Sequence, residues 1–208
     1  MSSDTPLRAG LDERIRSRDR IGAVDLAHAS LDDGSVTLGD LYRVLSEILV
    51  DVGVEWQRGT AAVWQEHFVT GVVRTIVESC ATRVEAAAPE ERGATVVLAA
   101  PGDEYHDLGL RMLTDRFILA GWQAHFLGAN LPVDELSAAV EELGADAVAL
   151  SASTHFHRVG LRSYISILSA ARPRLRIWVG GPAFAREHEG WEDELMLDPL
   201  DVPSPGDL

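Results

Sequence analysis

Residues 95–110 read TVVLAAPGDEYHDLGL, and this stretch decides the fold class of the C-terminal half of the chain. A β-branched apolar run is followed by a loop rich in glycine and charged residues, and a segment of helical length comes next. Comparable apolar runs, separated by further segments of helical length, occur at residues 123–127, 147–150 and 177–179. This alternation predicts an α/β domain over residues 89–208, with a parallel sheet flanked by helices.

The N-terminal residues 1–88 predict a helical domain of the four-helix-bundle type. Apolar residues at helical spacing predict one helix from Leu11 to an Asp-Asp-Gly turn. Residues 37–53 predict a second helix, which begins with a capping signal at Thr37. The stretch 54–84 contains two glycines, so it predicts either one kinked helix or two.

The C-terminal end is acidic from Glu187 onward and finishes with the sequence DVPSPG at residues 201–206. Acidic ends of this composition bury little apolar surface. We therefore expect this end of the chain to be frayed.

The charge balance of the chain is acidic: 33 acidic side chains against 18 basic ones, in 208 residues, give a net charge of −15. All the basic residues are arginine, and direct nucleic-acid binding is not expected without clustered lysine and arginine. The single cysteine, Cys80, excludes an internal disulfide and a cysteine-cluster metal site. No run of about 18 apolar residues is present, so we expect a cytoplasmic protein that does not bind membranes.

Polar and small residues follow three of the predicted strands. Glu104, His106 and Gly109 follow the first strand, whereas the groups SAST at 151–154 and GG at 180–181 follow the third and fourth. Ligands of open parallel sheets bind beyond the carboxyl ends of the strands, so we expect these residues to line one slot. A carboxylate can accept the N–H of an imidazole and leave the other nitrogen free for a metal, and a glycine permits close approach of the following helix. On the loop alone, a solvated turn with a helix-capping acid is an equal alternative.

These residues resemble the cobalamin-binding domain in their order, spacing and strand context, over about residues 94–185. The resemblance implies a Rossmann-like, flavodoxin-like sheet, cobalamin as the cofactor, and His106 as the lower axial ligand of its cobalt. It also implies that the cofactor and its nucleotide tail lie against a further set of residues, namely Glu104, Gly109, Ser151, Ser153, Thr154, Gly180 and Gly181. Glu104 stands where many members have aspartate, and Ser153 stands where leucine or threonine is commoner.

A second group of candidate residues lies in the helical half. Trp56, Val63 and His67 are separated by seven and four residues, so a continuous helix places them on one face with Glu66 beside them. An aromatic plane, a small apolar group and a polar pair can form a lid over a flat macrocycle. Core packing is the ordinary explanation of such a stripe, and it stays open on the spacing alone.

The same residues resemble the four-helix cap of the B12-dependent photoreceptors of the CarH/LitR type and of the AerR-type antirepressors. The resemblance implies that Trp56 covers the upper axial ligand and that Val63, Glu66 and His67 lie near an adenosyl group. Adenosylcobalamin is then the expected form of the cofactor, with methylcobalamin as the alternative. In the DNA-binding photoreceptors a histidine follows this tryptophan and ligates cobalt after light has removed the adenosyl group. Gln57 stands at that position here, and glutamine is a poor cobalt ligand.

Together these resemblances imply a light or cofactor sensor that is not itself an enzyme. Light breaks the cobalt–carbon bond, the cap helices shift, and the changed surface acts on further copies of the chain or on a separate transcription regulator. We recognise no winged-helix DNA-binding domain in the sequence, which agrees with its acidic charge. A corrinoid methyl carrier of a methyltransferase system is the alternative function, because the cobalamin half fits it equally well.

The remaining histidines belong to no motif. Two of them, His155 and His157, follow the third predicted strand. We expect both to be solvated loop residues, with contact to the corrin rim or the nucleotide tail as the alternative.

Overall fold

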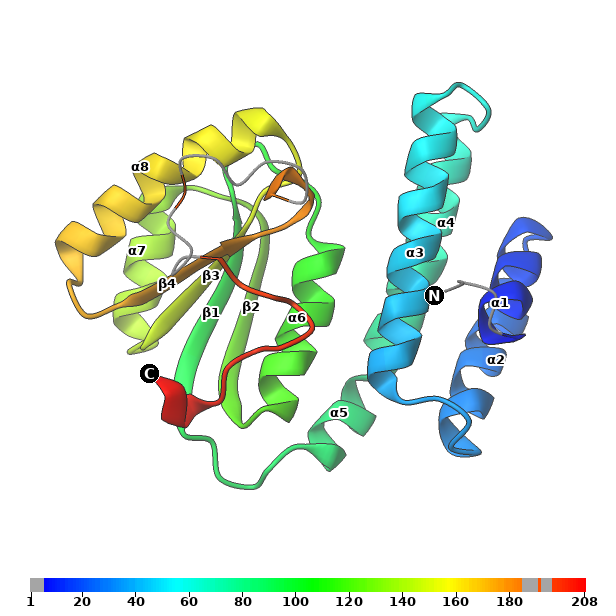
Figure 1. The fold of residues 1–208 in the computed structure, drawn as a ribbon, viewed down its shortest axis with the longest axis horizontal. Coiled ribbons are helices and arrows are strands. Elements are labelled where there is room, and N and C mark those ends of the chain that lie inside the picture. The colour runs from blue at the N-terminus through cyan, green and yellow to red at the C-terminus, as the bar shows by residue number, and fades with distance from the viewer. Residues whose placement is uncertain (1–5, 185–190, 192–195) are drawn as a thin grey trace. The chain divides into compact units, whose positions relative to one another are not determined.

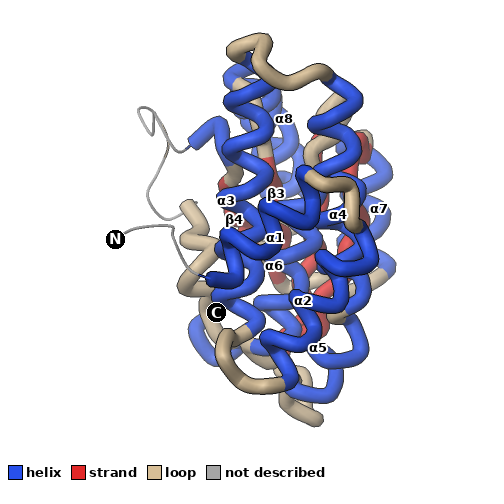
Figure 2. The backbone as a smooth tube through the Cα atoms, turned by 90° about the vertical axis from the view of Figure 1, so that its right-hand side faces the viewer, coloured by secondary structure: helices blue, strands red, loops and turns tan. Residues whose placement is uncertain are grey.

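The chain divides into two units, residues 1–82 and 83–208, which we call the helical unit and the α/β unit (Figure 1). The structure, a computed structural model, describes residues 6–184, 191 and 196–208. Every strand that it describes belongs to the α/β unit, and these strands are red in Figure 2. The predicted fold class, a helical N-terminal region followed by a parallel sheet with helices, is confirmed. No helix among the described residues is long and apolar enough to cross a membrane.

In the described part of the helical unit, residues 6–82, four helices form the bundle: α1 (Pro6–Arg16), α2 (Arg20–Asp32), α3 (Leu38–Gln57) and α4 (Val63–Ser79). Their apolar stripes meet in a core, because each helix buries residues spaced three or four apart. Leu11, Leu45, Val73 and Ile76 are fully buried there. A short helix, α5 (Ala81–Ala87), follows at the boundary between the units.

The prediction of one helix starting near Leu11 and running to the Asp-Asp-Gly turn is wrong, because the chain breaks between α1 and α2. Arg18 adopts a left-handed conformation with φ of 66°, and the side chain of Asp19 accepts the N–H of Gly22 to cap α2. Neither proline nor glycine marks the break in the sequence. The apolar spacing was similar on both sides, which is why it suggested a single helix.

The second predicted helix begins as expected but ends later. Thr37 and Asp40 form the capping box of α3, with the Thr37 hydroxyl accepting the Asp40 N–H. The helix then passes through Gly53 and ends at Gln57, since one glycine inside a helix costs only about 1 kcal/mol. The next stretch, residues 54–84, is neither one kinked helix nor two. It holds the end of α3, all of α4 and the start of α5, with a turn at Gly59, where φ is 73°.

The α/β unit contains a four-stranded parallel sheet in the order β2-β1-β3-β4. Its strands are β1 (Ala94–Pro101), β2 (Trp122–Leu131), β3 (Ala147–Ser151) and β4 (Arg176–Gly180). The connecting helices are α6 (Leu108–Leu119), α7 (Val133–Glu142) and α8 (His155–Ala171), and a short helix η1 (Pro182–Phe184) follows β4. The central strand β1 is buried along most of its length, as expected for a parallel sheet covered on both faces.

The two faces of the sheet carry separate cores. On one face, α7, α8 and η1 contribute Leu136, Leu161 and Phe184 to a cluster with residues of β1, β3 and β4. On the other face, α6 packs Phe117 against two tryptophans, Trp122 and Trp178, whose ring centroids lie 5.5 and 5.7 Å from that of the phenylalanine. These cores fix the strand ends that carry the candidate site.

The C-terminal segment 196–208 packs on the α/β unit, so the prediction of a frayed end is wrong for these residues. Met196 forms a parallel bridge with Val179, and the indole N–H of Trp122 donates to the carbonyl of Pro203 over 2.7 Å. The segment runs along the sheet in Figure 1, where it is red. Its apolar residues explain the packing, since Leu197 and Val202 join the core on the α6 face. The rest of the predicted frayed region, 187–190 and 192–195, lies outside the described residues.

Candidate functional site

The structure brings together the loops that follow β1, β3 and β4. Ser151 at the end of β3 is in register with Gly180 at the end of β4, and Ala152 donates its N–H to the Gly180 carbonyl over 3.0 Å. The β1 loop joins them because Glu104 accepts the backbone N–H of Ser153 over 2.7 Å. All three groups of residues therefore meet at the carboxyl edge of the sheet, where ligands of parallel sheets bind.

The β1 loop is held in place by two side chains from elsewhere in the chain. The amide oxygen of Asn130 accepts the N–H of Asp103 over 2.8 Å, and the Asn130 N–H donates to the carbonyl of Glu104 over 2.9 Å. The hydroxyl of Tyr164 on α8 accepts the N–H of Gly102 over 2.8 Å. Sequence reasoning missed Asn130 and Tyr164, since no local motif links them to the loop.

Glu104 is fully buried and its carboxylate is surrounded by donors. Oε1 accepts the His106 N–H over 3.0 Å and lies 2.7 Å from Nδ1 of His106. Oε2 accepts the N–H and the hydroxyl of Ser153 over 2.7 and 2.5 Å. Burial by itself raises the pKa of Glu104, but the hydrogen bonds from Ser153 and His106 outweigh it and lower the pKa to about 2. The group is therefore a carboxylate at neutral pH.

His106 is anchored at one nitrogen and open at the other. Its side chain is 76% exposed, although its Nδ1 lies against the buried Glu104 carboxylate. Nδ1 also lies 3.0 Å from the Ser153 hydroxyl, and no described residue forms a hydrogen bond with Nε2. An N–H at Nδ1 bound to a carboxylate leaves the Nε2 lone pair directed outward, which is the arrangement of a metal-binding imidazole.

The alternative of a solvated turn with a helix-capping acid does not describe this loop. Asp107 occupies the cap position of α6 but makes no side-chain capping bond. The acid that orders the loop is Glu104, and its oxygens are directed to His106 and Ser153.

The glycines and Thr154 of the predicted site have different structural roles. Thr154 caps α8, accepting the N–H of His157 over 3.3 Å. Gly181 has a φ of 99°, and a Cβ there would lie 2.5 Å from Oγ of Ser151, so this position requires glycine. Gly109 was expected to permit close approach of its helix, but a Cβ there would meet no atom within 4 Å, and the position borders open space instead.

His157 is the residue that sequence reasoning most clearly misjudged. It lies in the first turn of α8, not in a loop, and its side chain is only 13% exposed. Its Nδ1 lies 2.8 Å from Oε2 of Glu104, the oxygen opposite the one that contacts His106. The available signal was its position three residues after Thr154, which is the spacing between a helix cap and the backbone that it caps.

The candidate residues of the helical unit lie at one end of a helical hairpin. The condition of a continuous helix is not met, because Trp56 lies in the last turn of α3 and Val63 begins α4. The turn between them places the end of α3 beside the start of α4 (Figure 1). Trp56 and Val63 are 50% and 51% exposed, so neither is a core residue. Glu66 lies 2.7 Å from Nδ1 of the exposed His67 and accepts the Thr70 hydroxyl over 2.8 Å.

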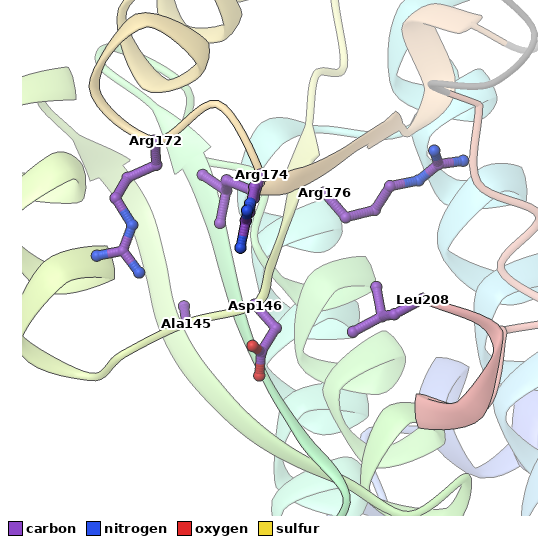
Figure 3. A pocket seen from close by; sticks show the side chains of 7 residues that line it. Ala145, Asp146, Arg172, Arg174, Arg176 and Leu208 are labelled. Atoms are coloured by element: carbon purple, nitrogen blue, oxygen red, sulfur yellow. The ribbon is translucent and has the colours of Figure 1, made fainter.

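A hollow of about 460 Å³ lies at the opposite edge of the sheet, where β3 and β4 begin (Figure 3). It is lined by Asp146, which precedes β3, and by three arginines, Arg172, Arg174 and Arg176. None of the predicted site residues lines this hollow. Because parallel sheets bind ligands at the carboxyl ends of their strands, we assign the candidate site to the loops around His106.

The chain is similar to several known proteins. The B12 binding domain family matches residues 94–196. The HTH-type transcriptional repressor CarH of Myxococcus xanthus is 37% identical over 156 residues, which is 74% of this chain and 50% of that protein. This chain therefore spans about half the length of that relative.

Corrinoid proteins are similar over a larger share of their own length. Dimethylamine corrinoid protein 3 of Methanosarcina acetivorans is 26% identical over 178 residues, covering 85% of this chain and 80% of that protein. The structure of the Methanosarcina barkeri monomethylamine corrinoid protein superposes with a TM-score of 0.73 at 20% identity, covering 90% of this chain and 88% of that one. This last likeness shows a common fold.

Proposed function

We propose that this chain, a cobalamin-binding protein whose residues 94–196 belong to the B12-binding domain family, senses light or the state of its cofactor and passes the signal to another protein. The observation that carries the proposal is the combination of the anchored His106 with an exposed Trp56 and an ordered Glu66–His67 pair. His106 fits the lower side of a cobalamin. Trp56 and the Glu66–His67 pair fit a cap for its upper side.

His106 fits the role of lower axial ligand. Its exposed Nε2 is available for coordination, while Glu104 holds Nδ1 and selects the tautomer that a metal-binding histidine needs. The corrin ring supplies the other four nitrogens of the cobalt, so a single protein ligand suffices at the lower position. Bound adenosylcobalamin contributes a cobalt–carbon bond that light can cleave.

We propose that the nucleotide tail of the cofactor enters the slot between the β1, β3 and β4 loops. Gly109 borders open space at the start of α6, and this leaves room for a ligand. Gly181 lets the chain after β4 pass close to Ser151. Ser151 and Thr154 add hydroxyl groups to the proposed binding region.

We propose that the end of the α3–α4 hairpin contacts the upper ligand of the cofactor. Trp56 and Val63 expose about half of their surface, so this apolar surface is available to a ligand. The carboxylate of Glu66 is already oriented by His67 and Thr70, so it can accept a hydrogen bond from a ribose hydroxyl at little entropic cost. Loss of the upper ligand then removes contacts of the hairpin and shifts the packing of the helical unit.

We propose that the partner that receives the signal is a protein, either further copies of this chain or a transcription regulator. The net charge of −15 opposes direct contact with a phosphate backbone. The likeness to the repressor CarH supports a role in gene regulation.

The test is reconstitution of the chain with adenosylcobalamin in the dark. Absorption spectra and gel filtration before and after green light report the state of the cofactor and the assembly. We expect a stable dark complex whose spectrum and size both change on illumination. A protein that does not bind adenosylcobalamin, or whose size is the same before and after light, contradicts the sensor proposal.

A corrinoid methyl carrier is the second candidate, favoured by the match to a dimethylamine corrinoid protein over 80% of that protein's length. The two functions differ in the preferred upper ligand. A carrier must accept and release a methyl group, so it should bind methylcobalamin at least as tightly as adenosylcobalamin. A sensor with a cap for an adenosyl group should prefer adenosylcobalamin, and competition between the two forms separates the candidates.

A further inference from the structure

We propose that His157 is a positioning residue for His106, acting through the carboxylate that the two histidines share. It donates to Oε2 of Glu104 and so moderates how strongly Oε1 pulls on the Nδ1 proton of His106. This inference rests on the proposed cobalamin site, because its consequence is a lower ligand that binds cobalt less tightly than a carboxylate–histidine pair alone.

The contacts of His157 place its Nδ1 beside two oxygens. Its Nδ1 lies 2.8 Å from Oε2 of Glu104 and 2.9 Å from the hydroxyl of Thr154. The ring is held on α8, where the cap at Thr154 fixes the first turn, and the side chain is 13% exposed. In the proposed arrangement a proton on Nδ1 faces both oxygens, and the low exposure keeps water from competing for it.

Glu104 therefore has one imidazole on each oxygen. Oε1 lies 2.7 Å from Nδ1 of His106, and Oε2 lies 2.8 Å from Nδ1 of His157. Ser153 also donates to Oε2, through its N–H and its hydroxyl. Each donor on Oε2 draws negative charge toward that oxygen, so the remaining charge on Oε1 is smaller and its bond to His106 is weaker.

This arrangement and a mere packing role of His157 predict opposite effects of its removal on the strength of His106 as a ligand. A carboxylate bound to a metal-ligating histidine makes the imidazole a better ligand. Removing the His157 donor leaves Oε1 more basic, so His106 should become a stronger ligand. Loss of packing alone loosens the loop and weakens the ligand.

Two substitutions separate the donor from the shape of the side chain. His157→Asn keeps an N–H donor near the position of Nδ1, whereas His157→Leu has a similar size and no donor. His155→Leu is the matched control, because His155 lies on the same helix and contacts Arg158 instead of Glu104.

The first measurement uses the protein without cofactor. In proton and nitrogen NMR spectra, the Nδ1–H signal of His106 should move downfield in His157→Leu, as expected for a stronger hydrogen bond, and stay near its original position in His157→Asn and His155→Leu. An unmoved signal in His157→Leu, or an equal shift in His157→Asn, overturns the proposal.

The second measurement uses bound methylcobalamin at fixed pH. Absorption spectra over a range of temperature give the ratio of histidine-ligated to unligated cofactor, and we expect His157→Leu to raise this ratio about fivefold, the scale of one hydrogen bond. A lowered ratio means that His157 only packs, and overturns the proposal. If the unsubstituted protein binds no cobalamin, the proposed function fails, while the NMR result still decides whether His157 acts on His106.

Discussion

Nδ1 of His106 lies 2.7 Å from Oε1 of Glu104, so an imidazole that is 76% exposed is fixed to a carboxylate with no exposed surface. The pair joins the solvent-facing edge of the site to the interior of the α/β unit. It therefore ties the chemistry of the site to the stability of the fold, and both can be measured.

The charge of Glu104 should make the free energy of unfolding depend on pH. Its pKa falls from the ordinary 4.5 to about 2 in the folded chain, so the charged carboxylate stabilises the fold above pH 4.5. This contribution is lost as the pH falls from 4.5 toward 2. Glu104→Gln should lower the free energy of unfolding at pH 7 by about 1–3 kcal/mol and flatten its decline over that interval. Urea unfolding at several pH values checks this, with the exposed Glu141→Gln as the control.

His106→Ala should remove the lower ligand without unfolding the protein, because the exposed ring contributes little to the core. We expect bound cobalamin to show the spectrum of a form without a histidine ligand, and the free energy of unfolding to fall by about 1–3 kcal/mol, because Glu104 loses one hydrogen-bond donor. His125→Ala, on β2, serves as the control. A spectrum identical to that of the unsubstituted protein would refute the assignment of His106.

Two neighbouring glycines should respond differently to alanine. At Gly181 a Cβ would lie 2.5 Å from Oγ of Ser151 and 2.6 Å from the carbonyl oxygen of Ala152, and φ is 99°, so Gly181→Ala should cost about 1–3 kcal/mol of stability. At Gly180 a Cβ would lie 3.7 Å from the carbonyl oxygen of Leu197, which is an ordinary contact. Thermal unfolding of the two variants tests this difference, and equal melting temperatures would contradict it.

Gly109→Ala should affect the stability of the fold and the affinity for the cofactor in different ways. A Cβ at this helical position meets no protein atom within 4 Å, so the variant should be as stable as the original or more stable by up to about 1 kcal/mol. If the open space holds part of the cofactor, affinity for cobalamin falls. Gly160→Ala in α8, which also has open space around its Cβ, should gain similar stability and keep its affinity. Equilibrium dialysis with both variants gives the comparison.

Trp56→Ala should change the response to the cofactor more than it changes stability. The indole is 50% exposed, so the helical unit should lose little packing, whereas adenosylcobalamin should be held less tightly if the ring covers its upper ligand. Trp64→Ala is the matched control, since Trp64 is 53% exposed at the start of α4 and lies under the Arg18 guanidinium. Equal losses of affinity in the two variants would argue against a specific role for Trp56.

The strands and the core of the site could be predicted because their signals are local. A buried parallel strand is a short apolar run in the sequence. In the loop that follows β1, the carboxylate of Glu104 and the imidazole of His106 lie within three consecutive residues, so their pairing can be recognised locally. The parallel order then places the ends of β1, β3 and β4 at one edge. These steps need no knowledge of long-range contacts.

The supporting residues could not be predicted because their partners are distant in the sequence. Asn130 and Tyr164 bind the β1 loop from 27 and 62 residues away, and His157 reaches Glu104 only through the placement of α8. The break at Arg18 was missed for a different reason, since its left-handed turn uses a residue type that seldom adopts it. The packed C-terminal segment depends on a few apolar residues whose binding face exists only in the folded sheet.

The hydroxyl of Tyr164 receives the Gly102 N–H and donates to the carbonyl of Leu131, so one oxygen connects α8, the β1 loop and the end of β2. Both hydrogen bonds therefore depend on the position of one hydroxyl group. A rotation of α8 that withdraws the phenol breaks both bonds together, and the loop carrying the imidazole then loses its contact with α8 while Asn130 still holds it to β2. The position of His106 is thus coupled to the orientation of one helix.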